Sequence, residues 1–365
     1  MRIGSKLALL SLLSVLALTG CTAPVLQPTA SPTQTQEPEP DPVFIPAPLT
    51  GVLYEESVAG HLALPAVSAK IDNTFSGRPQ LALNDADIVY VTRVEGGMTR
   101  LLPVWHSIMP ETIGPVRSVR PVDAAVIHPF SGVFVYSGGQ APFKRAARET
   151  GLVMSDEDTE QGNETYFREK SRSAPWNLMF QAKKLQANYS DQPAPKPGFE
   201  FADSPTAELM GVKALKLTVK YPGSTSIWDI GQASFPWGNS AEPAWLRTMD
   251  KSEHLQQGGD RVVAKNVVVL ELEHDNSFID PRYGPIPKAK LVNNSGIAHI
   301  FTNGYYLKAT WTKAGSSEPI KLVMEGGAAV KLAAGNTWVE MMDASRSKLT
   351  VVEPEPEPST SSSDQ

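Results

Sequence analysis

Apolar residues in the first half of the chain fall into short runs that alternate with helical periods. The β-branched runs predict strands over 64–71, 87–94, 99–105 and 132–136. Helical character is expected over 122–128, 141–150 and 177–188. Pro121 stands where a first helical residue is favoured, and Gly151 follows the end of the second predicted helix. The first half is therefore expected to form a mixed α/β layer domain.

The second half of the chain has a different pattern, with strand signals and few helical periods. Strands are predicted over 215–219, 262–272, 297–301, 305–311 and 337–341. Asn303-Gly304 separates two of these runs and is the strongest short hairpin signal in the sequence. The predicted fold class is α+β, an N-terminal mixed α/β layer domain followed by a mainly β C-terminal domain.

The N-terminus has the pattern of a secretory signal. Arg2 and Lys6 precede an apolar run over 7–18, which is too short to span a bilayer. The sequence Leu18-Thr19-Gly20-Cys21 that follows resembles a bacterial lipobox. We expect a signal peptide over 1–20 and lipidation of Cys21. The lipid would anchor the protein to the membrane, because two or more acyl chains inserted in a bilayer give stable attachment. The alternative is an uncleaved anchor with a chance cysteine, and it exports the body equally.

Composition predicts the domain boundaries. Residues 21–50 are rich in proline and contain no lysine or arginine, which is typical of a disordered tether. The acidic tail 351–365 has the same character. A milder cluster of prolines over 188–212 predicts a linker between an N-terminal domain, 51–187, and a C-terminal domain, 213–350.

Charge and cysteine content exclude several classes of function. The net charge of -6 comes mostly from the two terminal segments, so the body is nearly neutral and no nucleic acid partner is expected. One cysteine cannot form an internal disulfide or a multi-cysteine metal site. The six histidines show no metal-ligand spacing, and no nucleophile elbow, Walker loop or zincin helix is present. We predict no metal and no cofactor.

Glycine pairs and arginines mark a candidate ligand site. Two predicted strands end in Glu95-Gly96-Gly97 and Ser137-Gly138-Gly139, where the backbone can approach a ligand. Arg117 and Arg120 flank Ser118 just before a predicted helix, and arginine forks match carboxylate or phosphate. The predicted ligand-binding set is Arg78, Glu95, Gly96, Gly97, Arg100, Arg117, Ser118, Arg120, Gly138, Gly139, Arg168, Arg172 and Asn177.

Other interpretations of these residues stay open. The glycine pairs also suit ordinary tight turns. The arginines also suit a structural network with the acidic residues Asp72, Asp87, Glu95 and Asp123. Alternatively, Asp72, Glu95 and Asp123 provide a general acid and base for glycan hydrolysis, given a suitable separation. The tryptophans are expected to pack in the core rather than to stack on sugars.

The same residues resemble the YerB-like family of bacterial lipoproteins. The resemblance rests on Ile71-Asp72-Asn73, Arg78-Pro79-Gln80, Glu95-Gly96-Gly97, Ile113-Gly114-Pro115-Val116-Arg117-Ser118, Ala174-Pro175 and Asn177, with fainter matches at Asn266, Trp311 and Trp338. It covers roughly residues 64–342 and implies an exported two-domain lipoprotein with no established reaction. The family often has histidine where this chain has Thr74 and Trp176, which weakens a catalytic interpretation.

The leading functional hypothesis is a lipid-anchored binding or accessory protein on the extracytoplasmic face of the bacterial cell membrane. Its arginine-lined pocket would hold an anionic small molecule or a cell-wall fragment. The alternatives are a cell-wall hydrolase with paired carboxylates and an assembly adaptor that docks another envelope protein.

Overall fold

The computed structural model describes residues 41–160 and 164–355. The predicted signal peptide, the lipidation site Cys21 and most of the predicted tether lie outside these residues. Within the described ranges, no helix combines the length and the apolar character needed to cross a membrane.

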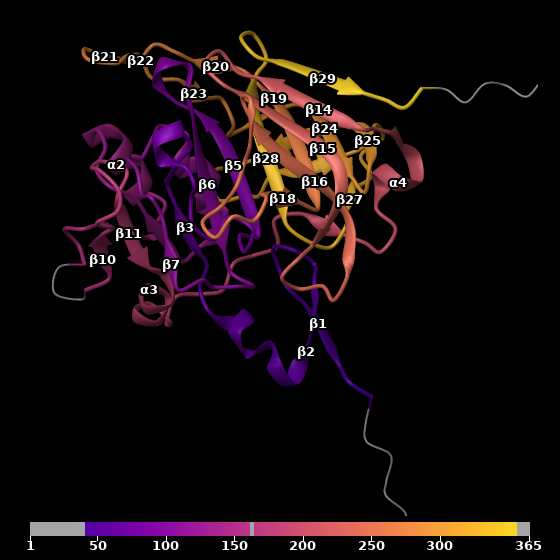
Figure 1. Ribbon diagram of the computed structural model, residues 1–365, viewed down its shortest axis with the longest axis horizontal. Coiled ribbons are helices and arrows are strands. Elements are labelled where there is room, and N and C mark those ends of the chain that lie inside the picture. Colours follow the sequence, from indigo (N-terminus) through magenta and orange to yellow (C-terminus); the bar gives the residue numbers. More distant parts are fainter. Residues whose placement is uncertain (1–40, 161–163, 356–365) are drawn as a thin grey trace, which may run out of the picture. The chain divides into compact units, whose positions relative to one another are not determined.

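One twelve-stranded sheet contains strands from both halves of the chain (Figure 1). Its main path, in spatial order, is β13 (Val212–Lys213), β25 (Tyr305–Lys313), β24 (Asn294–Thr302), β19 (Asn266–Leu272), β28 (Thr337–Asp343), β5 (Ile88–Arg93), β6 (Thr99–Trp105), β3 (Val67–Ala69), β8 (Val133–Val135) and β9 (Val153–Ser155). Two further strands pair beside this path, β26 (Lys321–Val323) with β25 and β4 (Ile71–Asp72) with β6.

The centre of this sheet joins the two halves of the chain. Strand β28 pairs in parallel with β5 on one side and with β19 on the other. All residues of β5 and β28 are buried. Parallel strands covered on both faces are apolar in continuous runs, which explains why the sequence of β5 does not alternate.

The remaining strands form smaller sheets. A six-stranded sheet contains β17 (Ser252–Glu253), β16 (Ala241–Met249), β15 (Thr225–Ser234), β14 (Lys216–Lys220) and β29 (Lys348–Val352), with β18 (Val263–Ala264) against β16. A three-stranded sheet contains β10 (Tyr166–Arg168), β11 (Leu178–Gln181) and β7 (Thr112–Ile113). Two-stranded pairs are β1 (Phe44–Pro46) with β2 (Leu53–Glu55), β12 (Glu200–Phe201) with β27 (Lys331–Leu332), β20 (His274–Asp275) with β23 (Lys288–Ala289), and β21 (Ile279–Asp280) with β22 (Gly284–Pro285).

The described helices are few and short. The α-helices are α1 (Asp123–Ile127), α2 (Ala141–Arg148), α3 (Ala182–Asn188) and α4 (Thr206–Met210), and the 3-10 turns are η1 (Glu56–Ala63), η2 (Phe75–Gly77), η3 (Glu95–Gly97) and η4 (His128–Phe130). The protein is thus mostly β. The helix predicted over 177–188 is wrong in its first turn, because 178–181 forms β11. A short apolar strand that runs directly into a helix cannot be separated from it by periodicity.

Two hydrophobic cores lie on opposite faces of the large sheet. Residues alternate between them, as strands require, with Ile88 and Tyr90 in one core and Val89 and Val91 in the other. The first core includes side chains of α1 and α2, and the second includes side chains of the six-stranded sheet. Five tryptophans are fully buried, as the core-packing interpretation expects: Trp105, Trp228, Trp245, Trp311 and Trp338.

The hairpin prediction is confirmed, because β24 and β25 pair around Asn303-Gly304. Both turn residues have positive φ angles, 50° and 80°. Asparagine and glycine tolerate this conformation, which the tight hairpin turn requires.

Three segments with linker-like composition contain ordered elements. The end of the predicted tether forms β1, and Leu49 beyond it is fully buried. The predicted linker 188–212 contains β12 and α4, and its Ala207 is buried. The predicted tail begins inside β29. Strand pairing and a few buried side chains order these segments despite their prolines. These local elements do not test the predicted domain boundaries, which stay predictions.

Candidate functional site

A buried carboxylate binds two of the predicted arginines. Glu95 follows β5, and its neighbours Gly96 and Gly97 have positive φ angles of 68° and 75° that turn the chain into β6. Arg120 Nε donates to Glu95 Oε2 at 2.7 Å, and Arg120 Nη2 also contacts Oε1. Arg100 Nη2 lies 3.4 Å from the same Oε1. All three side chains are less than a tenth exposed, so the carboxylate of Glu95 is fully paired inside the protein by two guanidinium groups.

The environment of Glu95 keeps it ionised. Burial alone would raise its pKa, but the hydrogen bonds and charges of Arg120 and Arg100 outweigh burial and lower the pKa to about 2. Burial, together with the charge of Arg120, lowers the pKa of Arg100 to about 10. A carboxyl group that stays charged at neutral pH cannot donate a proton there, so Glu95 is unsuited to act as a general acid.

Asp123 is held in a second buried ion pair. Its Oδ1 accepts from Lys70 Nζ at 2.6 Å, and neither side chain is exposed. Lys70 also donates to Thr92 Oγ1 at 2.7 Å. The other oxygen of Asp123 accepts from the backbone N–H of Arg120 at 2.7 Å. Asp123 therefore fixes the backbone at the start of α1, while Glu95 fixes the side chain of Arg120.

Asp72 pairs with Arg117 at the edge of this cluster. Arg117 Nε lies 2.8 Å from Asp72 Oδ2, and the other Asp72 oxygen accepts from the backbone and hydroxyl of Thr74 at 2.7 and 2.5 Å. Arg117 Nη1 donates to the carbonyl of Pro175 at 3.2 Å. Asp72 is buried and Arg117 is half-buried. This pair connects the Glu95 cluster to the loop that contains Pro175.

Asp87 differs from the other three acidic residues. The sequence offers it as an arginine partner, but its carboxylate accepts from the backbone N–H groups of His106 and Ser107 instead, at 2.5 and 3.1 Å. Burial raises its pKa to about 6, although these hydrogen bonds oppose the rise. The interpretation that arginines pair with these acidic residues is therefore wrong for Asp87, which instead holds the chain beyond β6, and for Asp123, whose cationic partner is Lys70.

Both glycine pairs are explained by close packing between protein segments. The carbonyl of Gly97 accepts from Gly223 N–H at 3.0 Å, and a Cβ atom on Gly97 would lie 3.0 Å from that nitrogen. The carbonyl of Gly138 accepts from Val119 N–H at 3.2 Å, and a Cβ atom on Gly139 would lie 2.5 Å from Val119 Cγ1. Each pair lets two backbones approach, which is the tight-turn interpretation of the sequence.

Two other predicted arginines line a cavity of about 440 Å³. Arg78 directly follows η2 in the sequence. Its Nη2 donates to the carbonyl of Asn73 at 3.2 Å and to the carboxylate of Asp250 at 3.4 Å. Arg172 Nη2 donates to the carbonyl of Pro79 at 2.6 Å and to Gln257 at 3.0 Å. The Nε of Arg172 lies 2.7 Å from Glu169. The cavity, called the Arg78–Arg172 cavity below, is lined by Ser76, Arg78, Pro79, Glu169, Ser171, Arg172, Ser173, Trp176 and Gln257.

Arg168 and Asn177 support the loop beside this cavity. Arg168 Nη1 donates to Asn177 Oδ1 at 3.0 Å, and its Nη2 contacts the carboxylate of Glu157. Asn177 Nδ2 donates to the carbonyl of Arg172 at 3.3 Å. The structure thus divides the predicted residues into a buried ion-pair cluster and an open cavity. Ser118 lies with the buried cluster, because its carbonyl accepts from Arg100 Nη1 at 3.1 Å.

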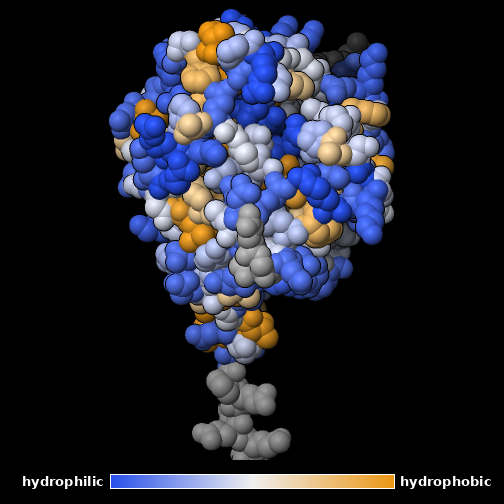
Figure 2. Space-filling view, turned by 90° about the vertical axis from the view of Figure 1, so that its left-hand side faces the viewer, coloured by the Kyte–Doolittle hydropathy of each residue, from blue (hydrophilic) through white to orange (hydrophobic). Residues whose placement is uncertain are grey.

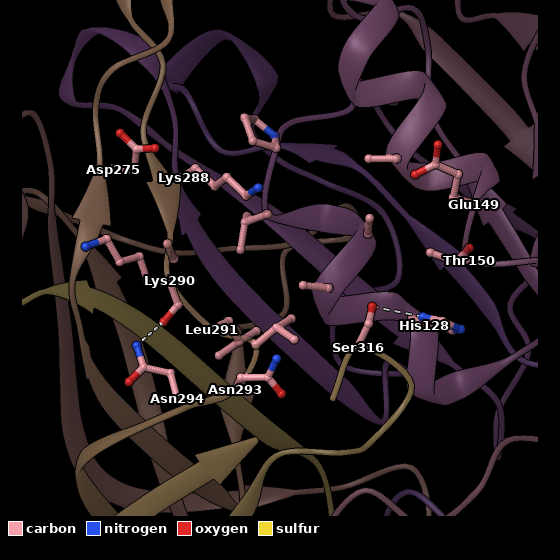
Figure 3. A pocket seen from close by; sticks show the side chains of 17 residues that line it. His128, Glu149, Thr150, Asp275, Lys288, Lys290, Leu291, Asn293, Asn294 and Ser316 are labelled. Atoms are coloured by element: carbon pink, nitrogen blue, oxygen red, sulfur yellow. Dashed lines mark hydrogen bonds between the residues drawn. The ribbon is translucent and has the colours of Figure 1, made fainter. Parts of the chain in front are cut away.

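A larger cavity, of about 770 Å³, lies outside the predicted site (Figure 3). Residues from α1 and α2 line one side of it, and residues 288–294 line the other. His128 and Ser316 also line it, and sequence reasoning missed both. They are 188 positions apart, and neither belongs to a recognisable motif, so no sequence signal joins them.

The described residues form a mostly β protein of two domains that share one sheet, with arginine–carboxylate pairs at one end of its central strands. Models of the family described as "Protein of unknown function (DUF3048)" match this chain, the N-terminal domain at residues 49–196 and the C-terminal domain at 226–339. The chain therefore belongs to the DUF3048 family, which confirms the resemblance to YerB-like proteins.

Comparisons of sequence and of structure with YerB of Bacillus subtilis extend this finding. The chain is 24% identical over 305 residues to the "Putative lipoprotein YerB" of Bacillus subtilis (strain 168), a match that covers 81% of this chain and 86% of that protein. The crystal structure of the YerB protein from Bacillus subtilis superposes with a TM-score of 0.69 and 22% identity, over 84% of this chain and 99% of that chain. The second match shows a shared fold.

Proposed function

We propose that this protein is a lipid-anchored binding protein of the cell envelope, and that it holds an anionic, hydroxyl-bearing ligand in the Arg78–Arg172 cavity. A cell-wall fragment that contains a sugar acid has this chemistry. The observation that carries the proposal is the lining of the cavity, where two guanidinium groups and one carboxylate, Glu169, are joined by serine hydroxyls and the indole of Trp176. Guanidinium forks recognise carboxylate or phosphate, hydroxyls recognise sugar hydroxyls, and an indole packs on an apolar sugar face.

The arginines of this cavity are better suited to a ligand than those of the Glu95 cluster. Arg100 and Arg120 already neutralise one buried carboxylate. Arg172 pairs with Glu169 at 2.7 Å, and that carboxylate is partly exposed. Arg78 is held mainly by a backbone carbonyl, and its ion pair with Asp250 is long and involves a half-exposed carboxylate. Such a pair contributes little stability, so a ligand anion can replace it at small cost.

The carboxylates support a hydrolase less well. Glu95, Asp123 and Asp72 each face a cationic side chain at short distance. A glycosidase needs one carboxyl group that is protonated at working pH and a second that is free to act on water or sugar. These contacts engage all three carboxylates in the fold instead.

An adaptor role has weaker support on the face shown in Figure 2. Apolar residues there form small separate patches among hydrophilic ones. Docking surfaces are typically larger and contiguous.

Titration with a defined sugar acid tests the binding proposal. N-acetylmuramic acid is N-acetylglucosamine with an added lactyl group that carries a carboxylate, so isothermal titration calorimetry of both at low salt measures the contribution of that acidic group. We expect the acid to bind at least about tenfold more tightly, since one charge-assisted hydrogen bond is worth roughly 1.5–3 kcal/mol. Arg172→Lys should lose this preference, because a lysine cannot form the bidentate fork.

Arg282→Lys is the matched control, because Arg282 is largely exposed and does not line the cavity. Equal affinity for the two sugars, or unchanged affinity in Arg172→Lys, would overturn the proposal. So would the absence of acid binding to the parent protein.

Anchoring is proposed from the lipobox and from the lipoprotein name of the Bacillus subtilis relative. Cells supplied with a labelled fatty acid should label the parent protein and should not label Cys21→Ser. Undiminished label in the variant would reject lipidation at Cys21, and would leave the binding proposal to be judged on calorimetry alone.

A further inference from the structure

The cavity of about 770 Å³ combines an apolar wall with a polar rim (Figure 3). Val122, Ala125 and Leu291 belong to its apolar lining. Lys288 and Lys290 lie on one side, and His128 and Ser316 lie on the other. This volume is in the range of pockets that enclose small organic molecules. The proposed ligand cavity has a separate lining and shares none of these residues.

A serine and a histidine are hydrogen-bonded in the lining of this cavity. His128 Nδ1 lies 2.9 Å from Ser316 Oγ, and Figure 3 draws this contact. His128 begins η4 directly after α1. Ser316 lies in the turn after β25. Two elements far apart in sequence therefore bring a hydroxyl and an imidazole together beside an open volume.

Lys313 fixes the turn that contains Ser316. Its Nζ donates to the carbonyl of Ser316 at 2.9 Å and also contacts the carbonyl of Glu318. Lys313 is buried. The serine is therefore held by a buried cation at its backbone and by His128 at its hydroxyl, as a positioned nucleophile must be.

We propose that Ser316 and His128 form a nucleophile–base pair for acyl transfer, and that the substrate is an ester with a short apolar acyl group. A serine hydroxyl within hydrogen-bond distance of an imidazole is the arrangement that activates serine. The apolar lining suits the acyl group. The polar rim balances Lys288 and Lys290 against Asp275 and Glu149, so a neutral leaving alcohol suits it.

The protonation state of His128 supports this role. Burial, with a further contribution from the charge of Lys313, lowers the pKa of His128 below its ordinary value. The imidazole is therefore neutral at pH 7 and can accept a proton. With the ring proton on Nε2, Nδ1 is the acceptor that faces Ser316.

The reaction balances with water as the second reactant. Ser316 Oγ attacks the ester carbonyl carbon, its proton passes to His128 Nδ1, and a bond forms between Oγ and the acyl carbon. The ester C–O bond breaks, and the leaving alcohol takes the proton from His128. Water then attacks the acyl-serine and gives a proton to His128. The Oγ–acyl bond breaks, Ser316 regains its proton, and the carboxylic acid leaves.

Labelling with a fluorophosphonate and hydrolysis of p-nitrophenyl butyrate test the proposal on the purified full chain. We expect the probe to label the parent protein at one serine, identified as Ser316 by mass spectrometry. Ser316→Ala should abolish the label. His128→Asn keeps an acceptor near the position of Nδ1 but removes the base, so labelling and hydrolysis should each slow about 100-fold.

Ser317→Ala is the matched control, because Ser317 is the exposed next residue and has no contact with His128 among those described. It should label and hydrolyse like the parent. Thermal melting separates loss of chemistry from loss of fold, and His128→Asn and Ser316→Ala should melt within a few degrees of the parent. An unlabelled parent, or equal labelling of the parent and Ser316→Ala, would overturn the proposal.

Discussion

The Glu95 cluster and the Arg78–Arg172 cavity contain the same residue types and differ in what the arginines contact. In the cluster, Arg100 and Arg120 donate to one buried carboxylate. In the cavity, Arg78 and Arg172 donate to backbone carbonyls, and each also pairs with a partly exposed carboxylate, Asp250 and Glu169 respectively. A guanidinium that neutralises a buried charge stabilises the fold. A guanidinium whose carboxylate partner is partly exposed is held less strongly, and a ligand anion can replace that partner.

Breaking the cluster should have the largest effect. Glu95→Ala leaves two buried guanidinium groups without their carboxylate, and an uncompensated buried charge costs about 3–5 kcal/mol. We expect the free energy of unfolding, measured by urea denaturation, to fall by that amount.

Glu157→Ala is the control for this change, because Glu157 pairs with Arg168 where both side chains are at least one-third exposed. Its effect should stay below about 1 kcal/mol. If Glu95→Ala cost no more than Glu157→Ala, the cluster would not be a stabilising network, and its arginines would again be candidates for a ligand.

Acid should weaken the cluster in a defined pH window. The pKa of Glu95 is lowered in the folded protein to about 2, from 4.5 in the unfolded chain. The unfolded state therefore binds the proton first, and the stabilisation is complete above pH 4.5 and lost as pH falls from 4.5 to 2. The loss amounts to about 3 kcal/mol. Denaturation curves collected across this window should show a smaller acid-dependent loss of unfolding free energy in Glu95→Gln than in the parent. An equal dependence of unfolding free energy on pH in the two proteins would contradict the lowered pKa of Glu95.

Much of the fold could be predicted from the sequence. The run over 99–105 is β6 without a change of boundary, and Asn303-Gly304 forms the hairpin turn. These features depend on local patterns. The pairing of β5 with β28 could not be predicted, because it joins Ile88 to Thr337 and depends on tertiary packing. The helices expected over 122–128 and 141–150 are present as α1 and α2, whereas the first turn expected over 177–188 is strand β11.

The candidate site was predictable as a set of residues but not as a geometry. The motifs around Glu95, Arg100 and Arg120 indicated charge clustering, yet the sequence could not separate mutual neutralisation from a ligand pocket. That difference depends on burial and on the direction of each side chain. The His128–Ser316 pair had no sequence signal, because common residues from distant turns create it.

Arg117 lies between the two regions and should show an intermediate effect. Arg117→Lys keeps the charge opposite buried Asp72 but loses the hydrogen bond to the carbonyl of Pro175. We expect a loss of about 1–2 kcal/mol in unfolding free energy, since one hydrogen bond from a charged donor is removed. Differential scanning calorimetry of Arg117→Lys and Glu95→Ala under the same conditions shows which variant loses more stability. If Arg117→Lys lost more unfolding free energy than Glu95→Ala, Asp72 and not Glu95 would be the main stabilising carboxylate of the network.

The smallest stability effect is expected in the cavity. Arg172→Lys retains a cation that can pair with Glu169, and the contacts with Pro79 and Gln257 that it weakens are exposed to water, so the free energy of unfolding should change by less than about 1 kcal/mol. The loss of the guanidinium fork should nevertheless remove the preference for a sugar acid. Arg172→Lys should therefore change ligand binding and leave stability nearly unchanged. Glu95→Ala should do the opposite, because it lowers the free energy of unfolding even when no ligand is present. Melting curves and calorimetric titration of the same preparations measure both quantities. If Arg172→Lys lowered stability as much as Arg117→Lys, Arg172 would be a structural residue like those around Glu95, and the distinction between the cluster and the cavity would fail.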